Sequence, residues 1–262
     1  MRRILIVAAA FVGLATSALA HDTWVQTNTN VVRVGDGVHI DLMLGNHGNE
    51  HRDFKLAGKV ALEQCTLEVI GPDGKKYDIK ERAIDTGYEP KDGFWSAKFI
   101  TGTAGLHTVS HTVDSLFRTK RSIKSAKTYF VASPSLDKVS RLNPGFEKPQ
   151  GHALEFIPET NPVTPMGPET PIKVRLLYKG KPLPAARVTF VARGENLSSE
   201  FDSHFERKTD AEGRATFTPT SGNYYLVVAH VIEPDEKGKS YDLTSYSATL
   251  TVFVPDLCPC CD

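Results

Sequence analysis

Short runs of β-branched and aromatic residues, many alternating with polar residues, recur along almost the whole chain. In the first half they cover residues 31–44, 65–79, 94–100, 105–113 and 127–133, with Gly, Pro and Asp at the turns between them. Alternation with a period of two places one face of a strand in a core. No long segment has the 3.6-residue period of a helix. The sequence therefore predicts an all-β protein.

The strands are predicted to divide into two β-sandwich domains. The pattern lapses over residues 134–150 into a stretch rich in Pro, Lys and Asn, which is typical of a linker. After it, strands alternate with turns such as KGKPL and TDAEGR, in the order found in transthyretin-like or immunoglobulin-like β-sandwiches. We expect one β-sandwich over 21–133 and a second, transthyretin-like one over 151–256.

Residues 1–20 are typical of a secretory signal peptide. Two arginines precede an apolar run, and the run ends in the A-x-A pattern of Ala18 and Ala20. The run is shorter than the roughly 20 residues that span a bilayer, and no other stretch is long enough. We therefore expect a periplasmic protein, cleaved before His21, with no membrane span in the mature chain.

Charge and cysteine content restrict the partners. The whole chain has 31 basic and 31 acidic residues, and without Arg2 and Arg3 it has 29 against 31. This balance does not favour nucleic acid or an anionic membrane as a partner. Cys65 stands alone, whereas Cys258, Cys260 and Cys261 crowd the tail at 257–262. A disulfide between Cys65 and the tail, or a thiolate metal site within the tail, would each suit this distribution.

The new amino terminus is the strongest chemical feature. His21 can bind a divalent metal through its α-amine and its Nδ1 together, closing a chelate ring that no internal histidine can form. Nitrogen donors of this kind suit copper, nickel, cobalt and zinc. The amino-terminal motif with histidine in third place is absent, because Thr23 occupies that place. The alternative is that His21 follows the cleavage site by chance.

Further imidazoles lie in three places where sheet ends or strand faces would expose them. The candidates are His47 with Glu50 and His51 in the loop GNHGNEH, His107 and His111 on one face of a strand, and His230 at the end of the strand YYLVVAH. Each place also has an interpretation without metal binding: a polar loop, a solvated strand face or the end of a sheet, respectively. None has the spacing of a zinc finger or of an H-E-x-x-H helix.

Several segments, in their order, resemble one bacterial family. They are AHDTW at the cleavage site, GDGV, the loop at 45–47, GHALEFIPETNP at 151–162, GKPLPAARV, TDAEGRATF, and VVAHVI followed by SYSATLTVFV. Together they resemble secreted proteins grouped as periplasmic components of cobalt and nickel uptake systems, over nearly the whole mature chain. The resemblance implies metal handling at His21, His47 and His230. His111 is outside that pattern and rests on the strand-face argument alone.

The leading hypothesis is a periplasmic protein, not an enzyme, that captures a divalent transition metal for a membrane uptake transporter. The metal would be nickel or cobalt, with copper and zinc as further candidates, held by His21, His47, His230 and His111. Asp22 or Glu50 would orient an imidazole by accepting a hydrogen bond from the ring nitrogen that does not bind the metal.

Two other classes of function remain open. A copper histidine-brace oxidative enzyme would need a flat aromatic surface to hold a polymer, and the chain offers Trp24 and Trp95. A structural or adhesive β-sandwich module is the other alternative, since fold does not give function.

Overall fold

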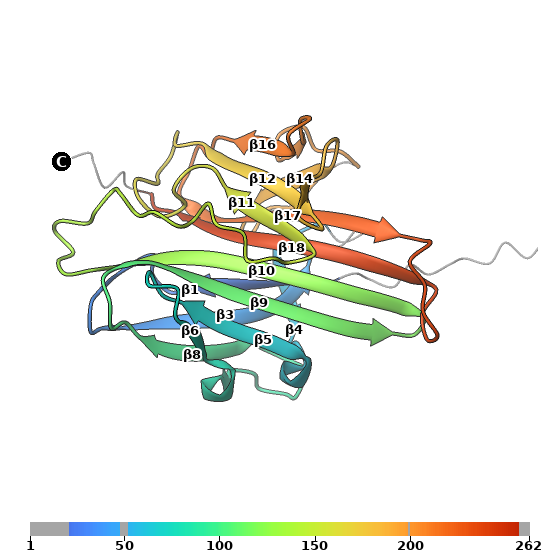
Figure 1. Ribbon diagram of the computed structural model, residues 1–262, viewed down its shortest axis with the longest axis horizontal. Helices are drawn as coiled ribbons and strands as arrows, with labels where there is room; N and C mark the ends of the chain where they lie inside the picture. The colour runs from blue at the N-terminus through green and yellow to red at the C-terminus, as the bar shows by residue number, and fades with distance from the viewer. Residues whose placement is uncertain (1–20, 48–51, 199, 257–262) are drawn as a thin grey trace, which may run out of the picture.

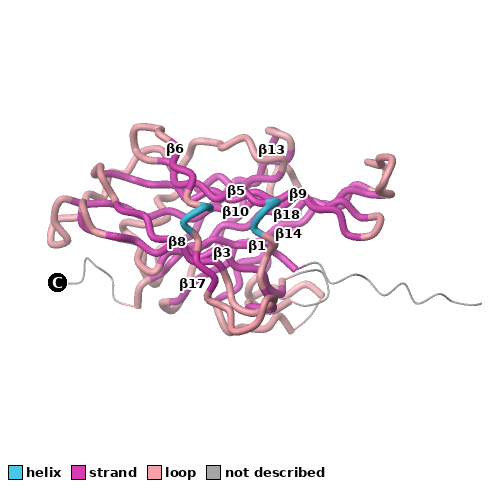
Figure 2. Tube along the Cα trace, turned by 90° about the horizontal axis from the view of Figure 1, so that it is seen from below, coloured by secondary structure: helices cyan, strands magenta, loops and turns pink. Residues whose placement is uncertain are grey.

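Strands make up most of the molecule (Figure 2). The computed structural model describes residues 21–47, 52–198 and 200–256. Helical structure within these ranges is limited to two short 3-10 segments, η1 (Leu62–Gln64) and η2 (Lys80–Arg82). The all-β prediction is therefore confirmed.

The described residues form three sheets. The amino-terminal sheet has the order β1 (His21–Thr27), β3 (Gly37–Asn46), β8 (Trp95–Ile100) and β7 (Ile84–Asp85), with β4 (Lys55–Gly58) also on β3. The central sheet has the order β15 (Glu206–Lys208), β14 (Arg187–Ala192), β17 (Asn223–Glu233), β18 (Leu243–Val254), β10 (Lys120–Ser133), β9 (Gly105–Phe117), β5 (Cys65–Ile70) and β6 (Lys76–Asp78), with β2 (Val31–Arg33) on β10. The carboxy-terminal sheet consists of β11 (Leu154–Pro158), β12 (Ile172–Tyr178) and β13 (Lys181–Pro182), with β16 (Arg214–Phe217) on β12.

The outer two sheets cover opposite faces of the central sheet. On β17, Val227 and Ala229 belong to the core shared with the carboxy-terminal sheet, whereas Leu226 and Val228 pack with Trp24 of β1. Successive residues of a strand point to opposite faces, so β17 is buried on both sides. In Figure 1, β12 and β16 lie above the central strands and β3 and β8 lie below them.

The two predicted sandwiches share this central sheet. Strand β10, from the first half of the chain, pairs in parallel with β18, from the second, with Lys120 opposite Leu243 and Lys127 opposite Leu250. The prediction of two β-sandwiches is confirmed, and the structure adds that they are joined by backbone hydrogen bonds. Residues 134–150, all described, contain no strand. The domain limits stay a prediction.

Local details depart from the sequence pattern in three places. The run at 31–44 is two strands, because the chain turns at Gly35, where φ is +94°. Strand β1 was not predicted, and β10 begins seven residues earlier than the expected 127. The turn residues GPDG at 71–74 predict a hairpin. This hairpin is present between β5 and β6, where Gly74 N donates to Gly71 O at 2.9 Å.

Candidate functional site

Pairing of β1 with β3 brings the first residues of β1 next to His47. His21 pairs with the residue before His47, and Asp22 pairs with Gly45. A Cβ atom on Gly45 would lie 2.4 Å from the Trp24 ring. Glycine is therefore required for the close approach of the two strands that positions this cluster.

His230 reaches the same place from the central sheet. It follows Leu226 and Val228 on the face of β17 that packs with the amino-terminal sheet. Its Nε2 donates to the Asp22 carboxylate, at 2.9 Å from Oδ2 and 3.1 Å from Oδ1. Asp22 is 1 % exposed. The expectation that Asp22 orients an imidazole is met by this contact, and the imidazole is that of His230.

His47 completes the cluster. Its ring centroid lies 6.4 Å from that of His230, with 22° between the ring planes. The side chain is buried, and its Nδ1 has no hydrogen-bond partner among the residues that the structure describes. Burial lowers the pKa of His47 to about 4, although the nearby Asp22 carboxylate acts in the opposite direction. His47 is therefore a neutral imidazole with an unused nitrogen at neutral pH.

The Asp22 carboxylate stays ionised. Burial is the largest single effect and would raise its pKa, but His230, through its charge and its hydrogen bond, and the Lys124 ammonium together outweigh burial. The net pKa of Asp22 lies below its ordinary value. The cluster thus combines a buried negative charge with two imidazoles.

A cavity of about 600 Å³ opens beside the cluster and is lined by His21, Asp22 and His230 among others. Lys124 Nζ, from β10, donates to the backbone carbonyl of His21. Burial lowers the pKa of Lys124, with Asp22 acting against it. Sequence reasoning does not single out Lys124, because this part of β10 lacks the apolar alternation of a buried strand.

His111 and His107 are buried under the amino-terminal sheet. His111 is fully buried, with its Nδ1 2.8 Å from Thr66 O and its Nε2 3.2 Å from Thr23 Oγ1. His107 stacks on Phe130 with ring centroids 4.8 Å apart. Because both ring nitrogens of His111 already bond to the protein, we leave His111 out of the site proposed below.

Other predicted groups lie elsewhere. Outside the described residues are Glu50, His51, Cys258, Cys260, Cys261 and residues 1–20, for which a signal peptide is predicted. Cys65 is a buried, free thiol whose Sγ lies 3.2 Å from Ala61 O, and burial raises its pKa to about 11. The disulfide considered between Cys65 and the tail is therefore not present.

The histidine cluster does not by itself form a complete metal site. Among the described residues, no group of three or more His, Cys, Asp and Glu side chains has the arrangement of a metal site. A metal held here would need a donor beyond these side chains, and the α-amine of a chain beginning at His21 would be such a donor. The described part of the chain also has no helix long and apolar enough to cross a membrane.

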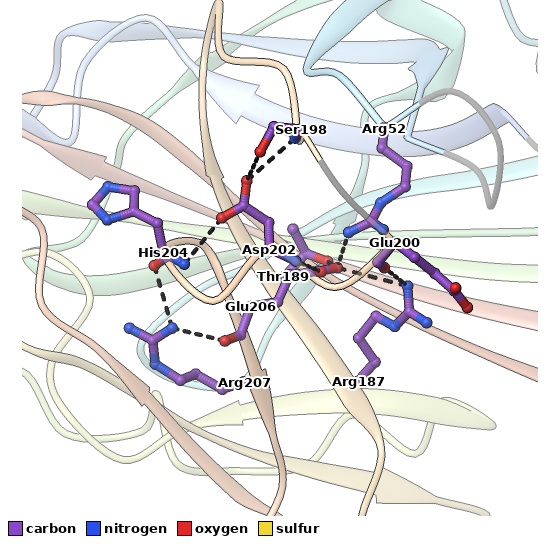
Figure 3. A network of polar contacts seen from close by, with 9 residues as sticks. All are labelled: Arg52, Arg187, Thr189, Ser198, Glu200, Asp202, His204, Glu206 and Arg207. Atoms are coloured by element: carbon purple, nitrogen blue, oxygen red, sulfur yellow. Dashed lines mark hydrogen bonds and ion pairs between the residues drawn. The ribbon is translucent and has the colours of Figure 1, made fainter.

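A second buried carboxylate is fully paired. Glu206 accepts hydrogen bonds from Thr189 Oγ1 at 3.0 Å and from the Asp202 backbone N–H at 2.6 Å, and it forms an ion pair with Arg52. Figure 3 shows Arg52 and Arg187 approaching Glu206 from different segments. This network connects segments that are distant in sequence. The Glu206 carboxylate is therefore satisfied by groups of the protein itself.

Comparison with known proteins identifies the family of this chain. The profile described as "Domain of unknown function (DUF4198)" matches residues 18–233. The chain belongs to the DUF4198 family. This family carries no assigned activity, and no curated protein matches the sequence. The DUF4198 match includes His21, His47 and His230.

Solved structures similar to this DUF4198 protein include an intimin fragment, an alpha-2-macroglobulin and an adhesin. The D0-D1 domain of intimin is 15 % identical, over 89 % of this chain and 98 % of that one, with a TM-score of 0.24. A Salmonella alpha-2-macroglobulin mutant is 14 % identical, over 88 % of this chain and 14 % of its own, with a TM-score of 0.27. The Yersinia pseudotuberculosis adhesin InvE is 15 % identical, over 88 % and 58 %, at 0.22. We draw no functional conclusion from likenesses this low.

Proposed function

We propose that this protein binds a late transition-metal ion in the periplasm and passes it to a membrane uptake system, without catalysing a reaction. The observation that carries the proposal is the unpartnered, buried Nδ1 of His47 beside the Asp22–His230 pair. Buried polar atoms are nearly always hydrogen-bonded, so an unused imidazole nitrogen next to a second imidazole points to a ligand.

Cleavage before His21 would supply the missing donors. The α-amine and the Nδ1 of His21 would chelate the metal, and His47 and His230 would each contribute one nitrogen. Asp22 already holds Nε2–H of His230, which leaves the other ring nitrogen for the metal. Carboxylate–histidine–metal arrangements of this kind fix the ring and raise its basicity.

The donor set indicates the class of metal. Imidazole and amine nitrogens suit nickel, cobalt, copper and zinc, and copper binds such sites most tightly whenever it is present. The resemblance to periplasmic components of cobalt and nickel uptake systems favours nickel or cobalt as the cargo. An imidazole must be neutral to bind a metal ion. Because its pKa is lowered, His47 stays able to bind metal down to about pH 5.

The positions of the two tryptophans do not support the alternative of an oxidative copper enzyme. Trp24 is buried, and the indole N–H of Trp95 donates to Val60 O at 2.8 Å. Neither side chain lies in a flat exposed surface that would hold a polymer.

The test is a titration of nickel, cobalt, copper and zinc into protein whose first residue is His21. We expect His47→Ala and His230→Ala each to weaken binding of the metal that the protein binds most tightly by about tenfold or more. His39→Ala is the matched control, because His39 lies exposed on the same strand that leads to His47. Unchanged affinity and stoichiometry in both site variants would contradict the proposal.

A further inference from the structure

The cavity beside His21 is larger than a bare metal ion requires. Strands β9, β10 and β18 continue past the first residue of β1, and their side chains form the cavity wall. Its volume of about 600 Å³ is that of a site for a small organic molecule. An ion held by nitrogen atoms directly would leave most of this space to another ligand.

One side of the cavity is positively charged, whereas apolar side chains such as Leu44, Val60 and Val113 form another side. Lys120 and Lys124 from β10 and Arg118 from the turn before it line the cavity. Within the described part of the chain, none of the three forms an ion pair with a carboxylate. The one carboxylate in the lining, that of Asp22, is hydrogen-bonded to His230. Such a wall disfavours the approach of a bare dication and favours an anion.

Hydroxyl groups lie between these cations. Ser122, on β10, is on the same face as Lys120 and Lys124, since residues two apart share a face. Ser245 and Ser247 line the cavity from the neighbouring strand β18. Lysine ammonium and serine hydroxyl groups are donors that carboxylate oxygens accept. The wall is therefore suited to carboxylates rather than to a cation.

We infer that the cavity holds a small polycarboxylate chelator that arrives bound to the metal, so that the cargo is a metal–polycarboxylate complex. This rests on the proposed function, because the metal end of the complex would lie at His21, His47 and His230. The free carboxylates would lie against Lys120, Lys124 and the serine hydroxyls. The chelator's negative charge offsets the repulsion between metal and wall.

Equilibrium dialysis with radiolabelled citrate, and then malate, tests the inference on protein that begins at His21. We expect about one citrate or malate per protein to be retained when Ni²⁺ is present, and at least tenfold less without it. Lys120→Glu should lower the chelator retained per nickel bound by at least tenfold. Lys98→Glu, an exposed lysine on β8, is the matched control and should retain the chelator as wild type does.

The outcomes separate the two proposals. Nickel binding without retention of either chelator would overturn the inference and leave the metal site intact. Retention that is the same with and without nickel, or the same in Lys120→Glu, would also overturn it. Failure to bind nickel either alone or as its citrate complex would overturn the proposed function, and with it this inference.

Discussion

Two buried carboxylates, Glu155 and Asp22, lie on opposite faces of the central sheet and differ in how many hydrogen-bond donors surround them. Glu155 forms an ion pair with Lys127 at 2.8 Å and accepts three backbone N–H groups, from residues 150–152. In the described part of the chain, Asp22 accepts hydrogen bonds from one side chain, that of His230, and Nδ1 of His47, which stacks with His230, has no partner. Saturated polar groups hold a fold together, whereas incomplete ones mark a place where a ligand completes the set.

The buried histidines repeat this contrast. His111 and His47 are both nearly inaccessible to solvent, and burial lowers the pKa of each to about 4. The nitrogens of His111 lie within hydrogen-bonding distance of Thr66 and Thr23, whereas Nδ1 of His47 has no partner. Burial and a lowered pKa therefore do not distinguish His47 from His111, but hydrogen bonding does.

The largest effect of a single substitution is expected where the buried ion pair of Lys127 and Glu155 is broken. Lys127→Met leaves Glu155 without its countercharge in a site where both side chains are 2 % exposed. Breaking a buried pair by removing one partner costs about 3 to 5 kcal/mol. Urea denaturation should show a loss of this size in the free energy of unfolding.

Lys173→Met is the matched control, since Lys173 is exposed on β12. We expect it to change the free energy of unfolding by less than about 0.5 kcal/mol. If Lys127→Met were as mild as this control, the view of Glu155 as a structural carboxylate would be wrong.

Acid should destabilise the metal-free protein through His47 and His111. Unfolding restores their ordinary pKa of about 6.5, so the unfolded state binds more protons between pH 6.5 and 4. Stability is thus complete above about pH 6.5 and falls as pH drops toward 4, by about 3 kcal/mol for each histidine. Asp22 and Glu155, whose pKa values are lowered, would lose their contributions only below about pH 4.

Urea denaturation at pH 7 and pH 4.5 measures this fall. Burial also lowers the pKa values of His107 and His152, which add to the fall. His111→Leu should remove its own part, about 2.5 kcal/mol between these two pH values. A free energy of unfolding that is the same at both pH values would show that these imidazoles are not held neutral by burial.

The smallest effects separate His47 from His111 directly. His111→Leu leaves Thr66 O and Thr23 Oγ1 without the ring and should cost about 1 to 3 kcal/mol. His47→Leu removes an unsatisfied buried nitrogen and should be neutral or stabilise the metal-free protein by about 1 kcal/mol, while metal binding is lost. A loss of stability in His47→Leu as large as in His111→Leu would assign both histidines the same structural role.

The fold was predictable where side chains alternate and not where strands carry polar residues. Apolar alternation predicted the core strands, and the turn residues GPDG predicted the hairpin at residues 71–74. Strand β1 and the first half of β10 are rich in charged, hydroxyl and amide side chains, because they border the cavity. The parallel pairing of β10 with β18 joins residues more than a hundred positions apart and leaves no local signal.

The candidate site was predictable in part. The cleavage pattern and the family resemblance singled out His21, His47 and His230, and the structure places His47 and His230 around Asp22. Their role in metal binding stays a prediction. His111 has its ring nitrogens engaged by the protein, which the strand-face argument did not anticipate, because alternation says which face a residue occupies and not what it bonds there.

The most direct test concerns the amino terminus. Metal affinity is measured for protein beginning at His21 and for the same protein with one alanine ahead of it, which removes the chelate and leaves every side chain in place. We expect the added alanine to weaken binding of the tightest metal by about 100-fold or more. Equal affinity in the two proteins would contradict the central claim that cleavage before His21 completes the site.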